Sequence, residues 1–194
     1  MQITELVLEE YSQDSEILRG DLDKCLIDVV KLLSENSMTV ATGESLTGGL
    51  LSERITSVPG ASQVFELGIC TYSDRMKRDL LHVPSGILSR YGAVSRQTAF
   101  AMAQGLSRIS GADLCLTVTG LAGPGGGTAE LPVGTVFAGF AFRNQVTAAK
   151  LDFSGPESPD RSGIRRMTAV CVFQIAKQIL LSRAELDPES GTCA

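Results

Sequence analysis

The chain has 194 residues, of which 43% are hydrophobic and 20% charged, and its formal net charge is -5 at pH 7. This length suits one domain with a single sizeable core. The acidic balance, the aromatic content of 5% and the lack of tryptophan argue against a nucleic-acid partner. No apolar run approaches a membrane-spanning length and the first residues do not resemble a signal peptide, so we expect a cytoplasmic protein without membrane contact.

The pattern of hydrophobic residues predicts alternating helices and strands. Residues 1–14 are acidic and weakly patterned, which indicates a loose arm or an extra helix. In chain order, the predicted elements are a helix over 16–36, a strand over 38–43, a helix over 47–57, a strand over 64–72, helices over 74–81, 84–90 and 96–109 with Ser95 as the cap of the last one, a strand over 114–119, a hairpin of 133–142 and 146–153, and a helix over 160–183. The tail, 184–194, is expected to fray.

This alternation predicts an α/β sheet that is covered by helices on both faces. The final hairpin makes the sheet mixed rather than purely parallel. No repeat or linker divides the chain, so we expect one domain over 1–194, with the arm and the tail at its ends.

Cysteine and histidine usage restricts the chemistry. The five cysteines are odd in number and contain no C-x-x-C pair, and His82 is the one histidine. A disulfide framework and a metal site are therefore not expected. A Ser-His-Asp triad would depend on that single imidazole, so we expect any serine chemistry to use another base.

A serine at a predicted strand-to-helix corner is the first candidate for chemistry. The segment Thr42-Gly-Glu-Ser45-Leu-Thr47-Gly48-Gly49 follows the strand over 38–43 and precedes a helix. This arrangement suits a nucleophile beside an oxyanion hole, or a phosphate cradle made of backbone amides. The alternative is that Ser45 or Thr47 only caps the helix, because serine and threonine are preferred there.

Tyr72 and Lys77 are the candidates for activating Ser45. Predicted strands end at Thr42, Tyr72 and Thr119, and ligands of α/β sheets gather at the carboxyl ends of strands. A desolvated lysine with a lowered pKa can deprotonate serine directly or through tyrosine. The alternative is that Tyr72 packs at a strand end and Lys77 is a solvated charge.

Two further segments are candidates for binding an anion. The glycine-rich stretch 120–127 has neither a P-loop pattern nor a dinucleotide fingerprint, so alone it also fits a mobile turn. Arg161 and Arg165 stand four residues apart in a predicted helix and can direct two guanidinium groups at one phosphate. A solvated basic face is the alternative.

Taken together, these residues resemble the CinA C-terminal domain family, whose stand-alone members are nicotinamide-nucleotide amidases. The resemblance spans residues 38 to about 182. The matching motifs, in family order, are T-G-E-S-L-T-G-G at 42–49, F-E-L-G-I-C-T-Y-S-D-R-M-K at 65–77, Y-G-A-V-S at 91–95, T-G-L-A-G-P-G-G-G at 119–127, P-V-G-T-V at 132–136, F-S-G at 153–155 and I-R-R at 164–166.

The resemblance implies hydrolysis of nicotinamide mononucleotide to nicotinic acid mononucleotide and ammonia, without a metal or organic cofactor. It implies that Ser45 is the nucleophile and that Tyr72 and Lys77 activate it, with either as the base. The substrate-binding candidates are Thr47, Gly48, Gly49, Thr119, Gly120, Gly123, Arg161 and Arg165, the first three as oxyanion donors. The family fold is a three-layer α/β/α sandwich with a mixed, mostly parallel sheet, and its members are usually dimeric, so a homodimer is expected.

Some positions depart from the family pattern and keep other functions open. Leu46 replaces a cysteine after the serine, Gly125 replaces an aspartate, and Leu131 replaces a common lysine. Gly43 replaces an alanine, and the segment around 156–159 is about four residues longer than in the family. One alternative is a non-catalytic nucleotide-binding or regulatory protein. A dehydrogenase of the short-chain type is disfavoured, because four residues instead of three separate Tyr72 from Lys77 and no dinucleotide loop follows an N-terminal strand.

Overall fold

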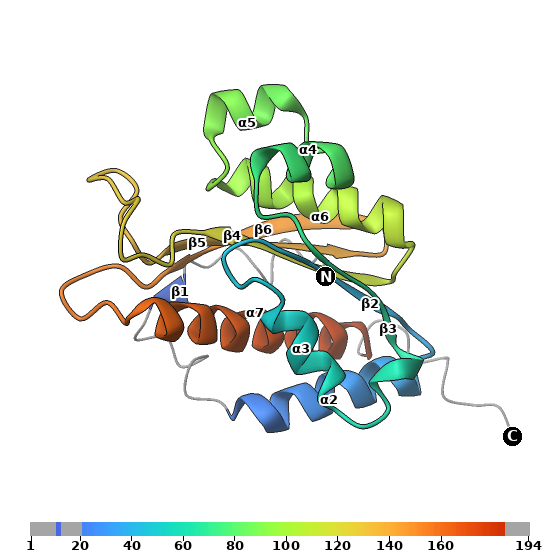
Figure 1. Ribbon diagram of the computed structural model, residues 1–194. Helices are drawn as coiled ribbons and strands as arrows, with labels where there is room; N and C mark the ends of the chain where they lie inside the picture. Colours follow the sequence, from blue (N-terminus) through green and yellow to red (C-terminus); the bar gives the residue numbers. More distant parts are fainter. Residues whose placement is uncertain (1–10, 13–20, 185–194) are drawn as a thin grey trace, which may run out of the picture.

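In the computed structural model, residues 11–12 and 21–184 are described, and they form a mixed sheet with helices on both faces (Figure 1). The strands are β1 (Tyr11–Ser12), β2 (Val40–Glu44), β3 (Phe65–Cys70), β4 (Leu114–Gly120), β5 (Thr135–Phe142) and β6 (Gln145–Asp152). The helices are α2 (Leu22–Glu35), α3 (Leu50–Thr56), the short 3₁₀ helix η2 (Ala61–Gln63), α4 (Asp74–Leu81), α5 (Ser85–Tyr91), α6 (Arg96–Ser110) and α7 (Arg161–Ala184).

The strands follow the order β1-β6-β5-β4-β2-β3. β2 pairs in parallel with β3 and with β4, whereas β5 is antiparallel to both β4 and β6. Every described strand except β5 therefore runs in one direction, which confirms the expected mixed, mostly parallel sheet. The carboxyl ends of β2, β3 and β4 lie at one edge of the sheet, where ligands of α/β proteins bind.

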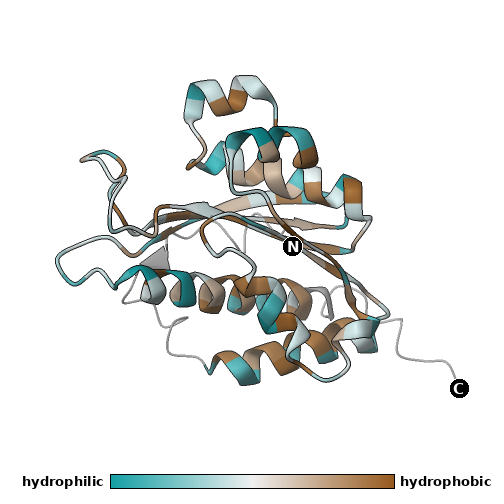
Figure 2. Cartoon of the chain, in the orientation of Figure 1, coloured by the Kyte–Doolittle hydropathy of each residue, from teal (hydrophilic) through white to brown (hydrophobic). Residues whose placement is uncertain are grey.

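The helices complete a three-layer α/β/α sandwich. α4, α5 and α6 cover one face of the sheet, while α2, α3 and α7 lie on the other (Figure 1). Each face has its own core: Leu33, Phe140 and Phe173 are buried in the larger core, and Leu81 and Met102 in the smaller one. Hydrophilic residues predominate at the start of α7, which lies at the same end of the molecule as the loops after the strands (Figure 2).

Local sequence signals explain where several helices begin. Asp21 caps α2 by accepting hydrogen bonds from the amides of Asp23 and Lys24. Ser73 caps α4 in the same way, and Ser95 caps α6 as expected from the sequence. Because serine and aspartate satisfy amides that have no partner inside the helix, these residues fix where α4 and α6 start.

The N-terminal arm differs from its expectation. Tyr11 and Ser12 form β1, which pairs in parallel with Leu151 and Asp152 of β6. The sequence predicted a loose arm or a helix for 1–14, and a strand of two residues is too short to show a hydrophobic alternation. The rest of the arm and the tail after Ala184 lie outside the described residues. No described helix is both long enough and apolar enough to cross a membrane.

Candidate active site

The turn between β2 and α3 carries Ser45 and is organised by Glu44. Glu44 is fully buried at the end of β2. Its carboxylate accepts hydrogen bonds from the amides of Gly49, Leu51 and Ser52 at 2.9, 3.1 and 2.9 Å, and from the Ser52 hydroxyl at 2.8 Å. The Glu44 carboxylate therefore accepts the hydrogen bonds of the amides at the start of α3.

This arrangement excludes the helix-cap interpretation of the serine corner. α3 begins at Leu50 after Gly49, and no side chain at the cap position bonds to it. The hydroxyl of Thr47 is buried without a hydrogen-bond partner among the described residues. Ser45 is 8% exposed, and its hydroxyl faces a different element, α4.

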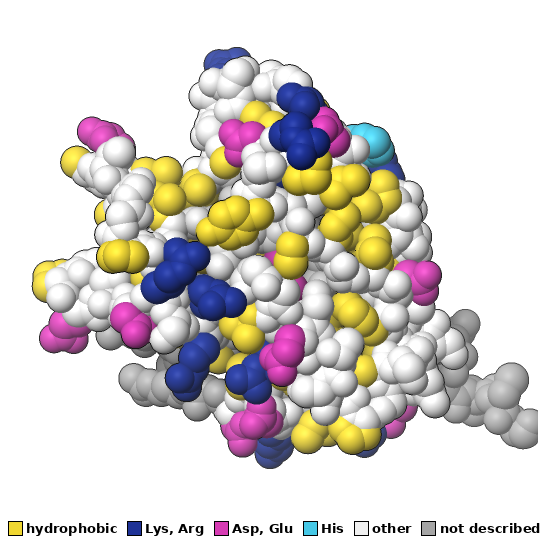
Figure 3. Space-filling model, viewed as in Figure 1, with side chains coloured by type: hydrophobic (Ala, Val, Ile, Leu, Met, Phe, Trp, Pro, Cys, Tyr) yellow, Lys and Arg dark blue, Asp and Glu magenta, His cyan; other side chains and the backbone are white. Residues whose placement is uncertain are grey.

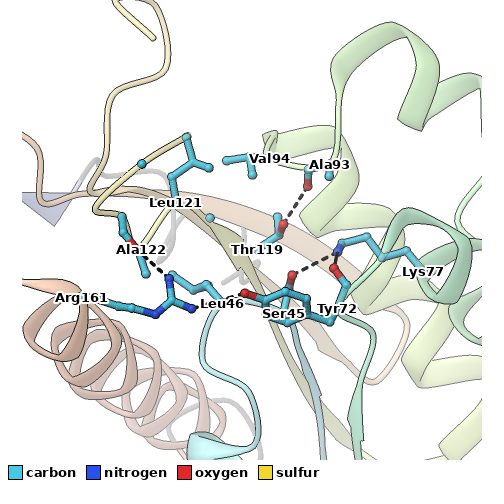
Figure 4. A pocket seen from close by; sticks show the side chains of 13 residues that line it. Ser45, Leu46, Tyr72, Lys77, Ala93, Val94, Thr119, Leu121, Ala122 and Arg161 are labelled. Carbon is cyan, nitrogen blue, oxygen red and sulfur yellow. Dashed lines mark hydrogen bonds between the residues drawn. The ribbon is translucent and has the colours of Figure 1, made fainter. Parts of the chain in front are cut away.

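Lys77 of α4 meets Ser45 directly. Its side chain is 1% exposed, so it is not the solvated charge of the alternative interpretation. The Lys77 ammonium nitrogen, Nζ, lies 3.1 Å from Ser45 Oγ. Nζ also donates to the backbone carbonyl of Thr71 at 2.9 Å and, as Figure 4 shows, to that of Tyr72 at 3.4 Å. Both carbonyls belong to the segment that joins β3 to α4.

The surroundings of Lys77 make its amine give up a proton more readily than an exposed lysine does. Burial lowers the pKa of the Lys77 amine from its ordinary value, and the nearby Asp74 carboxylate opposes this shift only in part. No salt bridge to Lys77 occurs within the described part of the chain. In its neutral form, this amine would keep two N–H groups on the carbonyls of Thr71 and Tyr72 and could direct its lone pair at Ser45 Oγ. Such an amine can accept the serine proton.

Tyr72 lies at the rim of the site rather than beside Ser45. Its side chain is 64% exposed, and its hydroxyl accepts a hydrogen bond from Arg161 Nη2 at 3.3 Å. Arg161 also donates from Nη1 to the carbonyl of Gly123 at 2.7 Å. These bonds connect the start of α7 to both the β3–α4 segment and the loop after β4. The phenol of Tyr72 makes no hydrogen bond to Ser45 or Lys77.

These residues line a pocket of about 250 Å³. In the view of Figure 4, Arg161 and Lys77 lie on opposite sides of Ser45. The residues that line the pocket are Ser45, Leu46, Tyr72, Lys77, Ala93, Val94, Thr119, Gly120, Leu121, Ala122, Gly123, Gly125 and Arg161. This set contains two basic side chains and no carboxylate, together with the apolar side chains of Leu46, Val94 and Leu121. The space-filling view shows basic side chains gathered over the start of α7 (Figure 3). The pocket therefore suits a ligand with an apolar ring and an anionic group.

Of the residues proposed for substrate binding, Thr119, Gly120, Gly123 and Arg161 line the pocket. The Thr119 hydroxyl donates to the carbonyl of Ala93 at 2.7 Å and so joins the end of β4 to the segment before α6. No three histidine, cysteine, aspartate or glutamate side chains of the described residues lie close enough together to hold a metal ion.

The other expected binding residues have different tasks. The amide of Gly48 donates to the Ser45 carbonyl at 3.1 Å, and that of Gly49 donates to Glu44. Neither is left as an oxyanion donor, which corrects the expectation from the sequence. Arg165 donates from Nη2 and Nε to the Thr47 carbonyl at 2.6 and 3.3 Å. Its guanidinium therefore holds the turn, and Arg165 does not line the pocket.

Glu44 is the residue that the sequence analysis missed. A carboxylate directly after the predicted buried strand over 38–43 was a usable signal, because buried carboxylates require several donors. Ala93, Val94 and Leu121 in the apolar wall were also missed, since their neighbours in the pocket come from distant segments.

The fold and the site define a class: an α/β/α domain with a buried serine–lysine pair at the carboxyl ends of its parallel strands. Over residues 23–180 the chain matches the family described as the CinA C-terminal domain. It is 47% identical, over 153 residues, to a putative competence-damage inducible protein of Thermoanaerobacter pseudethanolicus, which covers 79% of this chain and 36% of the relative. The chain belongs to the CinA C-terminal domain family.

Solved structures agree with this assignment. A competence-damaged protein (CinA) superfamily protein from Klebsiella pneumoniae superposes with a TM-score of 0.78 at 26% identity, over 84% of this chain and 99% of that chain. The competence/damage inducible protein CihA from Agrobacterium tumefaciens gives a TM-score of 0.75 at 36% identity, over 84% and 95%. The chain spans about a third of the length of the curated relative described above.

Proposed function

We propose that the protein is a serine amidohydrolase that converts nicotinamide mononucleotide into nicotinic acid mononucleotide and ammonia. The observation that carries the proposal is the buried hydrogen bond between Lys77 Nζ and Ser45 Oγ at 3.1 Å. A lysine with a lowered pKa beside a serine can act as its base, and such pairs activate serine nucleophiles. The family resemblance supplies the substrate.

In the first half of the reaction, Lys77 accepts the hydroxyl proton as Ser45 Oγ attacks the carboxamide carbon. The tetrahedral intermediate then collapses, and the carbon–nitrogen bond breaks. The Lys77 ammonium gives its proton to the departing nitrogen, which leaves as ammonia. The products of this half are an ester between Ser45 and the nicotinoyl group, and a neutral Lys77.

In the second half, water attacks the ester carbon while Lys77 takes a proton from it. The bond between the carbon and Ser45 Oγ breaks, and Lys77 returns the proton to Ser45. The net reaction consumes one water per amide and releases one carboxylic acid, which ionises to the carboxylate, and one ammonia, which takes up that proton. Tyr72 is assigned no proton transfer, since its phenol bonds to Arg161.

Backbone amides that remain available support an oxyanion hole at the start of the turn. Within the described residues, the amides of Leu46 and Thr47 donate to no acceptor, whereas those of Gly48 and Gly49 do. The amide that follows the nucleophile is a common oxyanion donor at strand-to-helix corners. One such donor contributes about 3 kcal/mol to transition-state stabilisation.

The pocket chemistry supports a nucleotide ligand. We assign the apolar wall of Leu46, Val94 and Leu121 to the pyridine ring. We assign Arg161 to the phosphate, because this exposed guanidinium lines the rim and forms charge-assisted hydrogen bonds readily.

Ammonia release from nicotinamide mononucleotide tests the proposal, with purified wild type and Ser45→Ala measured side by side. We expect release by the wild type and a loss of at least about 1,000-fold in the variant, as for other serine nucleophiles. Ser162→Ala, which alters an exposed hydroxyl on α7, is the control. If folded wild type binds the nucleotide without releasing ammonia, the amidase proposal is wrong and the non-catalytic nucleotide-binding alternative takes its place.

A further inference from the structure

The turn that carries Ser45 is held from two sides by charged side chains, neither of which lines the pocket. On one side, the Glu44 carboxylate receives the amides at the start of α3. On the other side, Arg165 of α7 donates twice to the carbonyl of Thr47. Arg165 bonds at residue 47 and Glu44 at residues 49–52, and the two side chains come from elements far apart in the sequence.

The peptide unit between Thr47 and Gly48 is hydrogen-bonded at both its carbonyl and its N–H. Its carbonyl oxygen accepts from Arg165, and its N–H donates to the Ser45 carbonyl. Gly48 and Gly49 then follow with φ of 59° and 99°, a conformation that glycine adopts freely but does not hold by itself. External contacts are therefore needed to keep the turn in one conformation.

The burial of these two charged side chains indicates that their contacts hold the turn in one conformation. Glu44 is fully buried, and a buried carboxylate is expensive unless donors surround it. Its donors are backbone amides and one serine, not a cation, so it acts as a fixed acceptor for a segment of main chain. Arg165 is half-buried, and its guanidinium binds the backbone carbonyl of Thr47.

We propose that Glu44 and Arg165 are positioning residues that together hold Ser45 against Lys77. They act on the nucleophile through the backbone of residues 45–49 and do not touch the substrate. The proposal deepens the serine chemistry and rests on the proposed function for its role in amide hydrolysis. It assigns Arg165 a task different from that of Arg161, although both lie on the first turns of α7.

The test has one readout that does not depend on the substrate: the rate at which a fluorophosphonate probe labels Ser45. Arg165→Met is compared with Arg165→Lys and with Arg166→Met, a control that removes an exposed charge from the neighbouring position. We expect labelling by Arg165→Met to slow about 10- to 100-fold, the effect of displacing a reacting group by about 1 Å. Arg165→Lys should recover part of the rate, because an ammonium can still donate to the Thr47 carbonyl. Arg166→Met should label at the wild-type rate.

Glu44→Gln tests the other side of the turn, with Glu53→Gln as the control at an exposed position of α3. An amide group cannot accept from every donor that Glu44 receives, so we expect a similar slowing of labelling. In both sets, kcat for nicotinamide mononucleotide should fall in parallel with the labelling rate, while KM changes less than about threefold. The same kcat loss is expected with the dephosphorylated nucleoside.

The outcomes separate this proposal from the amidase itself. If the wild type is labelled at Ser45 but releases no ammonia, the proposed function is wrong. The labelling rates of the variants then decide the positioning role. A wild type that is not labelled overturns the positioning role. Variants that label at the wild-type rate per folded molecule, with only a lower melting temperature, would show that the contacts are merely structural. A rise in KM for the phosphorylated substrate alone would make Arg165 a phosphate ligand and also overturn it.

Discussion

Replacing Lys77 is the most direct way to test how Ser45 is activated. Lys77→Arg carries a permanent positive charge and cannot accept a proton, because guanidinium stays protonated in proteins. Lys77→Met keeps a similar length and removes both charge and proton transfer. In each case Ser45 loses the base that lies 3.1 Å from its hydroxyl.

The expected loss follows from the role of a general base. Positioned acid–base groups accelerate reactions by about 100- to 10,000-fold, which corresponds to about 3 to 5 kcal/mol of activation free energy. KM should change little, since Lys77 acts on the reacting atoms. Lys77→Met also leaves the carbonyls of Thr71 and Tyr72 without a donor, so we expect stability to fall by about 1–3 kcal/mol. Folding of each variant is therefore checked by thermal unfolding.

The pH profile gives the same test in the wild type. Burial lowers the Lys77 pKa from its ordinary 10.5, and only the neutral amine accepts a proton. Plotted against pH, kcat/KM should therefore rise through an inflection below 10.5 and then level off. Lys31→Met, at an exposed position of α2, is the control and should keep the wild-type profile. An inflection at or above 10.5, or a Lys77→Met variant with more than half of the wild-type kcat, would refute the lysine-base mechanism.

Two further predictions concern substrate recognition and packing. Arg161→Met should raise KM for nicotinamide mononucleotide about tenfold or more, the value of charge-assisted hydrogen bonds, and leave KM for the unphosphorylated nucleoside unchanged. Steady-state kinetics on the two substrates decides this, and equal changes on both would rule out a phosphate contact. Gly139→Ala should lower the free energy of unfolding by about 1–3 kcal/mol, because the added Cβ would lie 2.2 Å from the carbonyl oxygen of Ala99 in α6. Urea unfolding measures this, and an unchanged free energy would contradict the close approach of α6 to β5.

Periodicity and turn chemistry predicted most of the fold. The helix over 74–81 and the Ser95 cap were predicted as the structure has them, because serine caps and helical spacing are local signals. β1 was missed, since two residues carry no period and their partner, β6, lies far along the chain. The homodimer stays a prediction.

Within the site, the pairing of Ser45 with Lys77 could be predicted because both follow the carboxyl ends of neighbouring parallel strands. The tasks of Arg165 and Gly49 could not. Whether a guanidinium or an amide binds a ligand or the protein itself depends on which backbone groups lack partners in the folded chain. The hydrogen-bond partners of these backbone groups are known only once the positions of Glu44 and the Thr47 carbonyl are known.

The positions of Ser45 and Lys77 in the chain have a consequence for how such a protein can diverge. Ser45 and Lys77 are only 32 residues apart, and both belong to the unit formed by β2, α3, β3 and α4. The opposite wall of the pocket comes from the loop after β4 and from Arg161 of α7. In the proposed amidase, bond-breaking and ligand choice would therefore depend on separate stretches of polypeptide. Under that proposal, a replacement such as Gly125 in the remote wall would change which amide is accepted and leave the serine–lysine pair intact.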